Sequence, residues 1–199
     1  MRPYAVGTID GPTDEWGAEP GADSAVWTPD QAVAQLYAAH WRGLVRLAWL
    51  LLHDQQVAED VVQEAFVSTY RRWASLRSPH AAVAYLRTAT VNGSRSALRK
   101  RGVRERYAAS QGSDVDRYVD SAESFAIASH NRDEVMTVLA QLPVRQREVL
   151  VLRYYLDLSE ADIAETLGIS RGAVKSHASR GISTLRGRLT VRAQQEDLP

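Results

Sequence analysis

Residues 159–180 read SEADIAETLGISRGAVKSHASR. The apolar residues of the first half fall on one face of a short helix. Gly168 stands where that helix must end, because glycine readily adopts the left-handed conformation of such an end. Ser170 is a good N-cap for a second helix. The stretch therefore predicts a helix-turn-helix, a motif whose second helix enters the DNA major groove.

The second helix of this motif is basic, and it carries Arg171, Lys175, His177 and Arg180. Between Glu165 and Glu196 the sequence has no acidic residue and six Lys or Arg. An ordinary two-helix corner needs no such positive run, whereas DNA phosphates attract it. DNA binding is therefore the preferred interpretation of this stretch.

The charge of the whole chain is segregated. The 199 residues have no net charge, but residues 1–30 hold six acids and one Arg. Residues 71–106 hold ten Lys or Arg and a single acid, Glu105. Together with the C-terminal run, this indicates two surfaces that face nucleic acid.

Several function classes find no support in the sequence. The chain has no Cys, which excludes disulfides and thiol catalysis and suits a reducing cytoplasm. No metal-ligand pair of His, no G-x-S-x-G and no phosphate-binding glycine loop is found, so we expect no enzyme, no metal and no cofactor. The longest apolar run, residues 47–52, is far shorter than the roughly 20 residues of a membrane span. Without a secretory signal either, we expect a cytoplasmic protein.

The helical spacing of apolar residues, with no sustained strand alternation, predicts an all-α chain of two small domains joined by a flexible linker. We expect a disordered acidic tail over 1–28, a first domain over 29–104, a linker over 105–128 and a second domain over 129–192. The first domain should hold helices over 29–52, 57–73 and 81–101. The second should be a four-helix domain that includes the helix-turn-helix.

Two faces of the first domain allow more than one interpretation. In the second helix, Asp60, Gln63, Glu64, Val67 and Arg71 lie opposite the apolar stripe, as either a solvated or a docking surface. The third helix ends in the basic residues 99–101, which either complement the helix dipole or contact phosphates. Ten basic residues exceed what a helix end needs, which favours phosphate contact.

Residues 58–73, AEDVVQEAFVSTYRRW, resemble the core-polymerase-binding helix of bacterial sigma factors. Residues 142–159, LPVRQREVLVLRYYLDLS, running into 174–177, resemble their promoter-binding C-terminal domain. The two-domain size, without a middle domain, is similar to the extracytoplasmic-function (group 4) class of the sigma-70 family. The Trp-rich first helix and residues 91–101 look most like actinobacterial members.

The resemblance implies a sigma factor that binds core RNA polymerase and directs promoter-specific initiation through −10 and −35 recognition. Its implied partners are the clamp helices of the largest polymerase subunit, the flap, promoter DNA and an anti-sigma protein, with no small-molecule substrate. The loop over 76–80 and the third helix would form the −10 pocket. Ser96 stands where many members have an Asp. The resemblance implies core contacts by Asp60, Gln63, Glu64 and Phe66; −10 contacts by Asn92, Arg95, Arg99 and Lys100; and −35 contacts by Arg171, Lys175, Ser176 and Arg180. Of these, Phe66 falls nearest the core stripe.

Other functions remain open on the residues alone. A LuxR-type helix-turn-helix regulator also fits residues 147–150 and 172–177, but it leaves residues 30–104 unexplained. A helical adaptor without a DNA role conflicts with the two basic blocks. An enzyme lacks any nucleophile–base pair or metal set.

Overall fold

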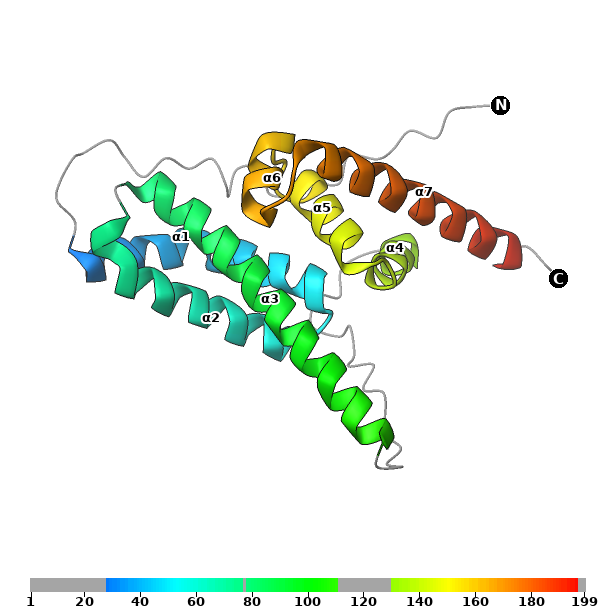
Figure 1. Cartoon of the computed structure of the whole chain (residues 1–199), viewed down its shortest axis with the longest axis horizontal. Coiled ribbons are helices and arrows are strands. Elements are labelled where there is room, and N and C mark those ends of the chain that lie inside the picture. The colour runs from blue at the N-terminus through cyan, green and yellow to red at the C-terminus, as the bar shows by residue number, and fades with distance from the viewer. Residues whose placement is uncertain (1–27, 77, 111–129, 197–199) are drawn as a thin grey trace.

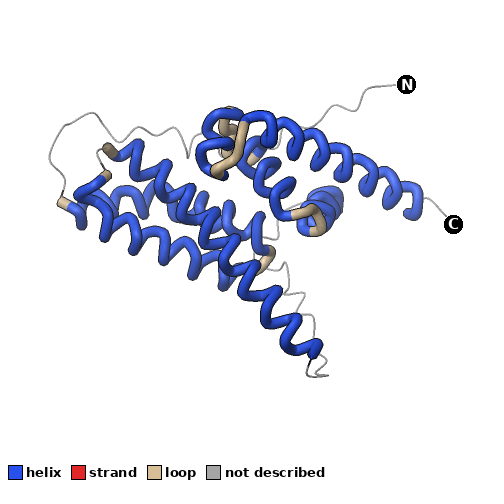
Figure 2. Tube along the Cα trace, in the orientation of Figure 1, coloured by secondary structure: helices blue, strands red, loops and turns tan. Residues whose placement is uncertain are grey.

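The computed structural model describes residues 28–76, 78–110 and 130–196, and every regular element among them is a helix (Figures 1 and 2). Helices α1 (Pro29–Leu52), α2 (Gln55–Arg72) and α3 (Pro79–Ser110) form one unit, with a short 3-10 turn, η1 (Trp73–Ser75), after α2. Helices α4 (His130–Ala140), α5 (Val144–Tyr154), α6 (Glu160–Leu167) and α7 (Arg171–Glu196) form a second. The expected all-α class, with four helices in the C-terminal part, is confirmed. Most of the acidic tail and of the linker lies outside the described residues.

Local capping explains where the helices of the first unit begin. The Thr28 hydroxyl accepts from the Gln31 amide, and the Gln31 side chain accepts from the Thr28 amide, which forms a capping box. Asp54 caps α2 by accepting from the Val57 amide at 2.9 Å. Between these helices, His53 takes a left-handed conformation with φ of 56°, which lets α1 end within one residue.

Helix α3 is longer than the sequence patterns predicted. The expected end at Arg101 is wrong, because the helix continues through Gly102 to Ser110, into residues assigned above to the linker. Residues 103–110 contain neither Pro nor Gly, and Arg101 pairs with Glu105 one turn later at 2.9 Å. The last turns of α3 consequently project beyond α1 and α2 (Figure 1).

The helix-turn-helix forms as its glycine and serine predict. Gly168 has φ of 64°, and its amide donates to the carbonyls of Ala164 and Glu165. The Ser170 hydroxyl accepts from the Ala173 amide at 3.2 Å. Ile163, Leu167 and Val174 are all buried. Helix α7 runs for 26 residues, well beyond the helix-turn-helix.

Two glycines allow helices to approach closely. A Cβ atom on Gly93 of α3 would lie 2.8 Å from Val61 Cγ1 of α2. A Cβ atom on Gly181 of α7 would lie 2.9 Å from Leu150 Cδ1 of α5. Any side chain at these positions would push the helices apart. Each unit therefore contains one close helix crossing that requires a glycine: α3 on α2 in the first unit and α7 on α5 in the second.

The two units pack against each other through α1, α3, α4, α5 and α6. Their buried apolar residues form one continuous cluster. Helix α7 lies along the outer side of α5 and α6, away from α1 and α2 (Figure 1). No helix among the described residues has the length and apolar content to cross a bilayer.

Candidate nucleic-acid interface and polymerase-binding face

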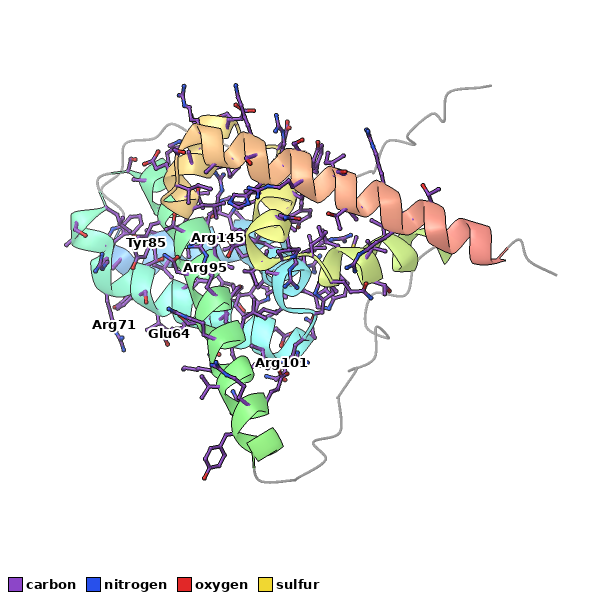
Figure 3. The ribbon with its side chains drawn as sticks, turned by 45° about the vertical axis from the view of Figure 1, so that its right-hand side comes forward. Glu64, Arg71, Tyr85, Arg95, Arg101 and Arg145 are labelled. Atoms are coloured by element: carbon purple, nitrogen blue, oxygen red, sulfur yellow. The ribbon has the colours of Figure 1, made fainter. Side chains whose placement is uncertain are left out.

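The outward face of α2 exposes three of the four residues expected to contact polymerase. Asp60, Gln63 and Glu64 are exposed, and Figure 3 shows Glu64 pointing away from the helices behind it. Phe66 is buried at 5 % exposure, and its ring centroid lies 5.2 Å from that of Tyr37. The structure therefore does not bring Phe66 to this face, because its position in the helix turns it toward α1.

A second exposed group lies beside this face. Val67 and Tyr70 of α2 are exposed, as is Tyr37 of α1. The Tyr37 ring stacks on Trp41 with 4.7 Å between centroids. The amphipathic pattern already placed Val67 on the outer stripe, so Val67 and not Phe66 is the apolar residue that this face exposes.

The basic end of α3 presents most of the residues expected at the −10 element. Asn92, Arg99 and Lys100 are exposed. The Arg99 Nη2 atom donates to the Ser96 hydroxyl at 3.1 Å. Ser96, at the position where many family members have an Asp, therefore orients an Arg without neutralising its charge. This end of α3 remains a cationic surface able to contact phosphates.

Arg95 differs from its neighbours because it is held by the other unit. Its Nε and Nη2 atoms donate to the two carboxylate oxygens of Glu148 in α5 at 2.6 and 2.9 Å. The Arg95 side chain is 19 % exposed and that of Glu148 2 %. Arg145 also donates to Glu148, at 3.2 Å. Figure 3 shows Arg95 and Arg145 together at the boundary between the two units.

The loop before α3 lies at the other end of that helix. Leu76 is half-buried, Ser78 and His80 are exposed, and residue 77 lies outside the described residues. Ser78 caps α3 by accepting from the Ala81 amide at 3.1 Å. The Arg72 guanidinium at the end of α2 lies 5.6 Å from the centroid of the Tyr85 ring in α3, so Tyr85 provides one aromatic face near the loop.

All four residues expected at the −35 element are exposed on the first turns of α7: Arg171, Lys175, Ser176 and Arg180. Arg180 Nη2 donates to the Ser176 hydroxyl at 2.9 Å, which couples their orientations. Lys175 Nζ lies 3.7 Å from a Glu160 oxygen, a loose pair at the surface. These side chains therefore spread over the solvent-exposed face of α7, with Arg171 and Arg180 at its opposite edges.

A groove beside this face was not foreseen from the sequence. Residues of α5 and α7 line it: Arg153, Tyr154, Lys175, Ala178, Ser179, Ile182, Ser183 and Arg186. Arg153 reaches Glu160 at 3.2 Å, so this carboxylate offsets part of the positive charge. The basic run after residue 165 indicated the α7 side of this groove. The α5 side could not be predicted from it, because it depends on how α5 crosses α7.

Buried ionisable groups concentrate where the two units meet. Burial, together with the nearby Arg147 guanidinium, lowers the pKa of His53 to about 4, against the opposing effect of a hydrogen bond to the Met136 backbone. His53 Nδ1 lies 3.4 Å from Arg147 Nη1. Burial also lowers the pKa of Arg147, while Glu148 opposes the shift. His53 is therefore neutral at pH 7 in this arrangement.

Comparisons with known proteins agree with this layout of helices. Residues 36–104 match the family described as Sigma-70 region 2, and residues 132–185 match Sigma-70, region 4. The RNA polymerase sigma-E factor of Streptomyces coelicolor is 33% identical over 150 residues, which cover 75% of this chain and 81% of the relative. The chain belongs to the sigma-70 family of RNA polymerase sigma factors. The ECF RNA polymerase sigma factor SigM of Mycobacterium tuberculosis is 31% identical over 154 residues, covering 77% of this chain and 75% of the relative.

A solved structure resembles this sigma factor across most of its length. The sigma factor RpoE of Bartonella quintana, in complex with the anti-sigma factor NepR, aligns with a TM-score of 0.64 and 26% identity. The alignment covers 79% of this chain and 96% of that one. The match of residues 36–104 to region 2 accounts for the part that a LuxR-type regulator left unexplained. That alternative is therefore not favoured, and the chain is a sigma factor of the extracytoplasmic-function type that directs transcription initiation.

Proposed function

We propose that this sigma factor divides its work between three surfaces. The outward face of α2 binds core polymerase, the basic end of α3 reads the −10 element, and the first turns of α7 read the −35 element. It acts in the cytoplasm as a non-catalytic initiation factor, over domains at 29–104 and 129–192. The observation that carries the proposal is that one chain exposes two cationic helix faces and one acidic helix face on separate elements.

The acidic face on α2 fits a docking role. Asp60 and Glu64 are four residues apart in a helix, and Gln63 lies between them, so the three share one exposed face. Glu64 and Asp60 give this face a negative charge that basic partner helices would complement. Exposed Val67 adds an apolar centre, and interface centres are commonly apolar. Polymerase clamp helices are the proposed partner.

The two DNA faces fit different DNA forms. The first turns of α7 follow a helix-turn-helix, which suits the major groove of duplex DNA. An Arg that contacts guanine by two hydrogen bonds gives about 1–3 kcal/mol of discrimination, and Arg171 and Arg180 are both exposed there. The basic residues of α3 suit contact with phosphates, and Tyr85, nearer the start of the same helix, offers an aromatic face of the kind on which the bases of opened DNA stack.

Paired variants test this division of roles. Arg171→Ala with Lys175→Ala should abolish binding to a −35 promoter duplex and leave affinity for core polymerase unchanged. Asp60→Ala with Gln63→Ala should weaken core binding, because both side chains are removed from the exposed face, and leave the circular dichroism spectrum unchanged. Loss of core binding in the first pair, or unchanged core affinity in the second, would contradict the assignment.

A matched control is available on α1, outside the acidic face. Gln35 is exposed on that helix. Gln35→Ala removes a polar side chain of similar size from a helix that carries none of the proposed polymerase contacts. It should leave core affinity within about twofold, a change smaller than the ~1 kcal/mol commonly lost at an energetically important contact. An anti-sigma protein is a further proposed partner, since the aligned RpoE structure contains one.

A further inference from the structure

Glu148 is a buried carboxylate whose partners come from both units. It lies in the middle of α5, and its side chain is 2 % exposed. Its two oxygens accept from Arg95 Nε and Nη2 of the other unit, and one accepts also from Arg145 Nη1. A buried carboxylate is stable only when its oxygens are paired in this way. The pairing therefore joins the two units through a charged group that needs its partner.

The partner of Glu148 is also a residue assigned above to the −10 surface. Both ends of the Arg95 guanidinium are engaged, because Nη1 donates to Asn92 Oδ1 at 3.1 Å. Asn92 is the neighbouring −10 candidate. A guanidinium held in this two-oxygen geometry cannot offer the same fork to a phosphate or a base. DNA can engage Arg95 only if Glu148 releases it.

Other contacts between the units add to this pair. The Tyr155 hydroxyl of α5 donates to the Gly43 carbonyl of α1 at 3.3 Å. The Arg46 guanidinium lies 5.9 Å from the centroid of the Tyr155 ring. Arg147 faces His53, and its Nε atom has no hydrogen-bond partner among the described residues. An interface that is polar at this edge, with the buried Arg147 Nε donor unsatisfied, suits reversible contact more than permanent packing.

The −35 surface is treated differently. Arg171, Ser176 and Arg180 lie on α7, which runs along the outer side of α5 and α6 (Figure 1). Among the described residues, none of them forms a hydrogen bond or an ion pair with α1, α2 or α3. The docked arrangement therefore engages one DNA-binding helix and leaves the other exposed.

We infer that the packing of α5 and α6 against α1 and α3 is a closed form of this sigma factor, in which Glu148 competes with −10 DNA for Arg95. This inference rests on the proposed role of α3. The apparent affinity for −10 DNA is the affinity of the open form multiplied by the fraction of molecules that are open, so closure lowers it. The affinity for a −35 duplex is unchanged, because the −35 surface is exposed in both forms. DNA bound at α3 opens the units, and opening exposes Arg95.

The absence of cysteine allows a direct measurement in the full chain. Ala38→Cys on α1 and Thr190→Cys on α7 place two thiols on exposed positions of the two units, outside the proposed DNA and polymerase faces. Labelling them with a donor and an acceptor dye reports the separation of the units by energy transfer. Glu148→Gln keeps the shape of the side chain and removes its charge. It should lower the transfer efficiency, because Arg95 loses its charged partner.

The same variant should bind opened DNA more tightly. With a random-sequence 20-nucleotide single strand as probe, Glu148→Gln should gain about tenfold in affinity, the ratio expected if the open fraction rises from roughly a tenth to near one. Glu105→Gln is the matched control, because it removes the same charge from the exposed Arg101–Glu105 pair on α3. It should leave transfer efficiency unchanged and raise affinity by less than about twofold, through weaker repulsion of phosphates alone.

Each outcome decides the inference. Wild-type transfer efficiency in Glu148→Gln would overturn the closed form, and open units with the affinity of Glu105→Gln would overturn competition for Arg95. If Glu148→Gln loses helix content by circular dichroism, Tyr155→Phe removes the hydrogen bond to Gly43 without a change of charge, and the same two readouts apply. Both readouts use the sigma factor without polymerase. A failure of polymerase-dependent initiation would therefore contradict the proposed function without deciding whether the closed form exists.

Discussion

Replacing Gly181 by Ala tests whether α5 and α7 cross as closely as described. The added Cβ atom would lie 2.9 Å from Leu150 Cδ1, 3.2 Å from Leu150 Cγ and 3.4 Å from Gln146 Cβ. Leu150 is 3 % exposed, so it has no open space to move into. Gly187 lies two turns later on the same helix, and a Cβ atom there meets nothing within 4 Å. It is therefore the matched control.

The two substitutions should change stability in opposite directions. Overpacking a core costs about 1–3 kcal/mol, whereas Gly to Ala within a helix gains about 1 kcal/mol. Because three atoms are crowded at Gly181, we expect Gly181→Ala to lose about 1–2 kcal/mol of unfolding free energy. Gly187→Ala should gain up to about 1 kcal/mol. The unfolding free energies of the two variants should thus differ by about 1–3 kcal/mol.

Urea unfolding followed by two signals measures this difference. All five Trp lie between residues 16 and 73, so fluorescence reports the first unit and circular dichroism reports both. In a double-mutant cycle, Leu150→Ala and Gly181→Ala together should cost about 1 kcal/mol less unfolding free energy than the sum of their separate costs. The reason is that removing the Leu150 side chain relieves the crowding at residue 181. A Gly181→Ala protein as stable as Gly187→Ala would refute the close crossing.

Three further predictions follow from other parts of the molecule. The ring of His53 should titrate near pH 4, whereas its pKa in the unfolded chain is 6.5. Between these two values the unfolded chain binds more protons than the folded one. The unfolding free energy should therefore fall by about 3 kcal/mol in total as the pH drops from 6.5 to 4. Titration of His53 near 6.5 by NMR would contradict its burial beside Arg147. Ser170→Ala should lose about 1 kcal/mol by removing the N-cap of α7, whereas Ser179→Ala, exposed within the same helix, should lose nothing; equal stabilities in urea unfolding would exclude the cap. Arg99→Gln should reduce the slope of log affinity against log salt by about 0.7 for single-stranded DNA, and an unchanged slope would remove Arg99 from the phosphate contacts.

The sequence was most informative where structure depends on neighbouring residues. The turn of the helix-turn-helix was predictable because Gly168 and Ser170 act within three residues of their own positions. The start of α1 was predictable for the same reason, since Pro29 and Asp30 mark a first turn. In each case the residue type restricts the backbone directly.

Other features depend on contacts between distant parts of the chain. Arg95 and Glu148 are 53 residues apart, and nothing in either segment indicates that they meet. The end of α3 was misjudged because a basic run before a glycine also marks a helix end, and Gly102 here continues the helix instead. The resemblance assigned Phe66 to the polymerase-binding face, although its position in the helix pattern placed it nearer the core.

Run-off transcription with core polymerase and genomic fragments tests the central claim most directly. The wild-type chain should direct initiation from specific fragments that carry −35 and −10 elements. The Arg171→Ala, Lys175→Ala protein should bind core polymerase and produce no specific transcript. Absence of specific initiation with folded wild-type protein, or undiminished initiation with the double variant, would contradict the account.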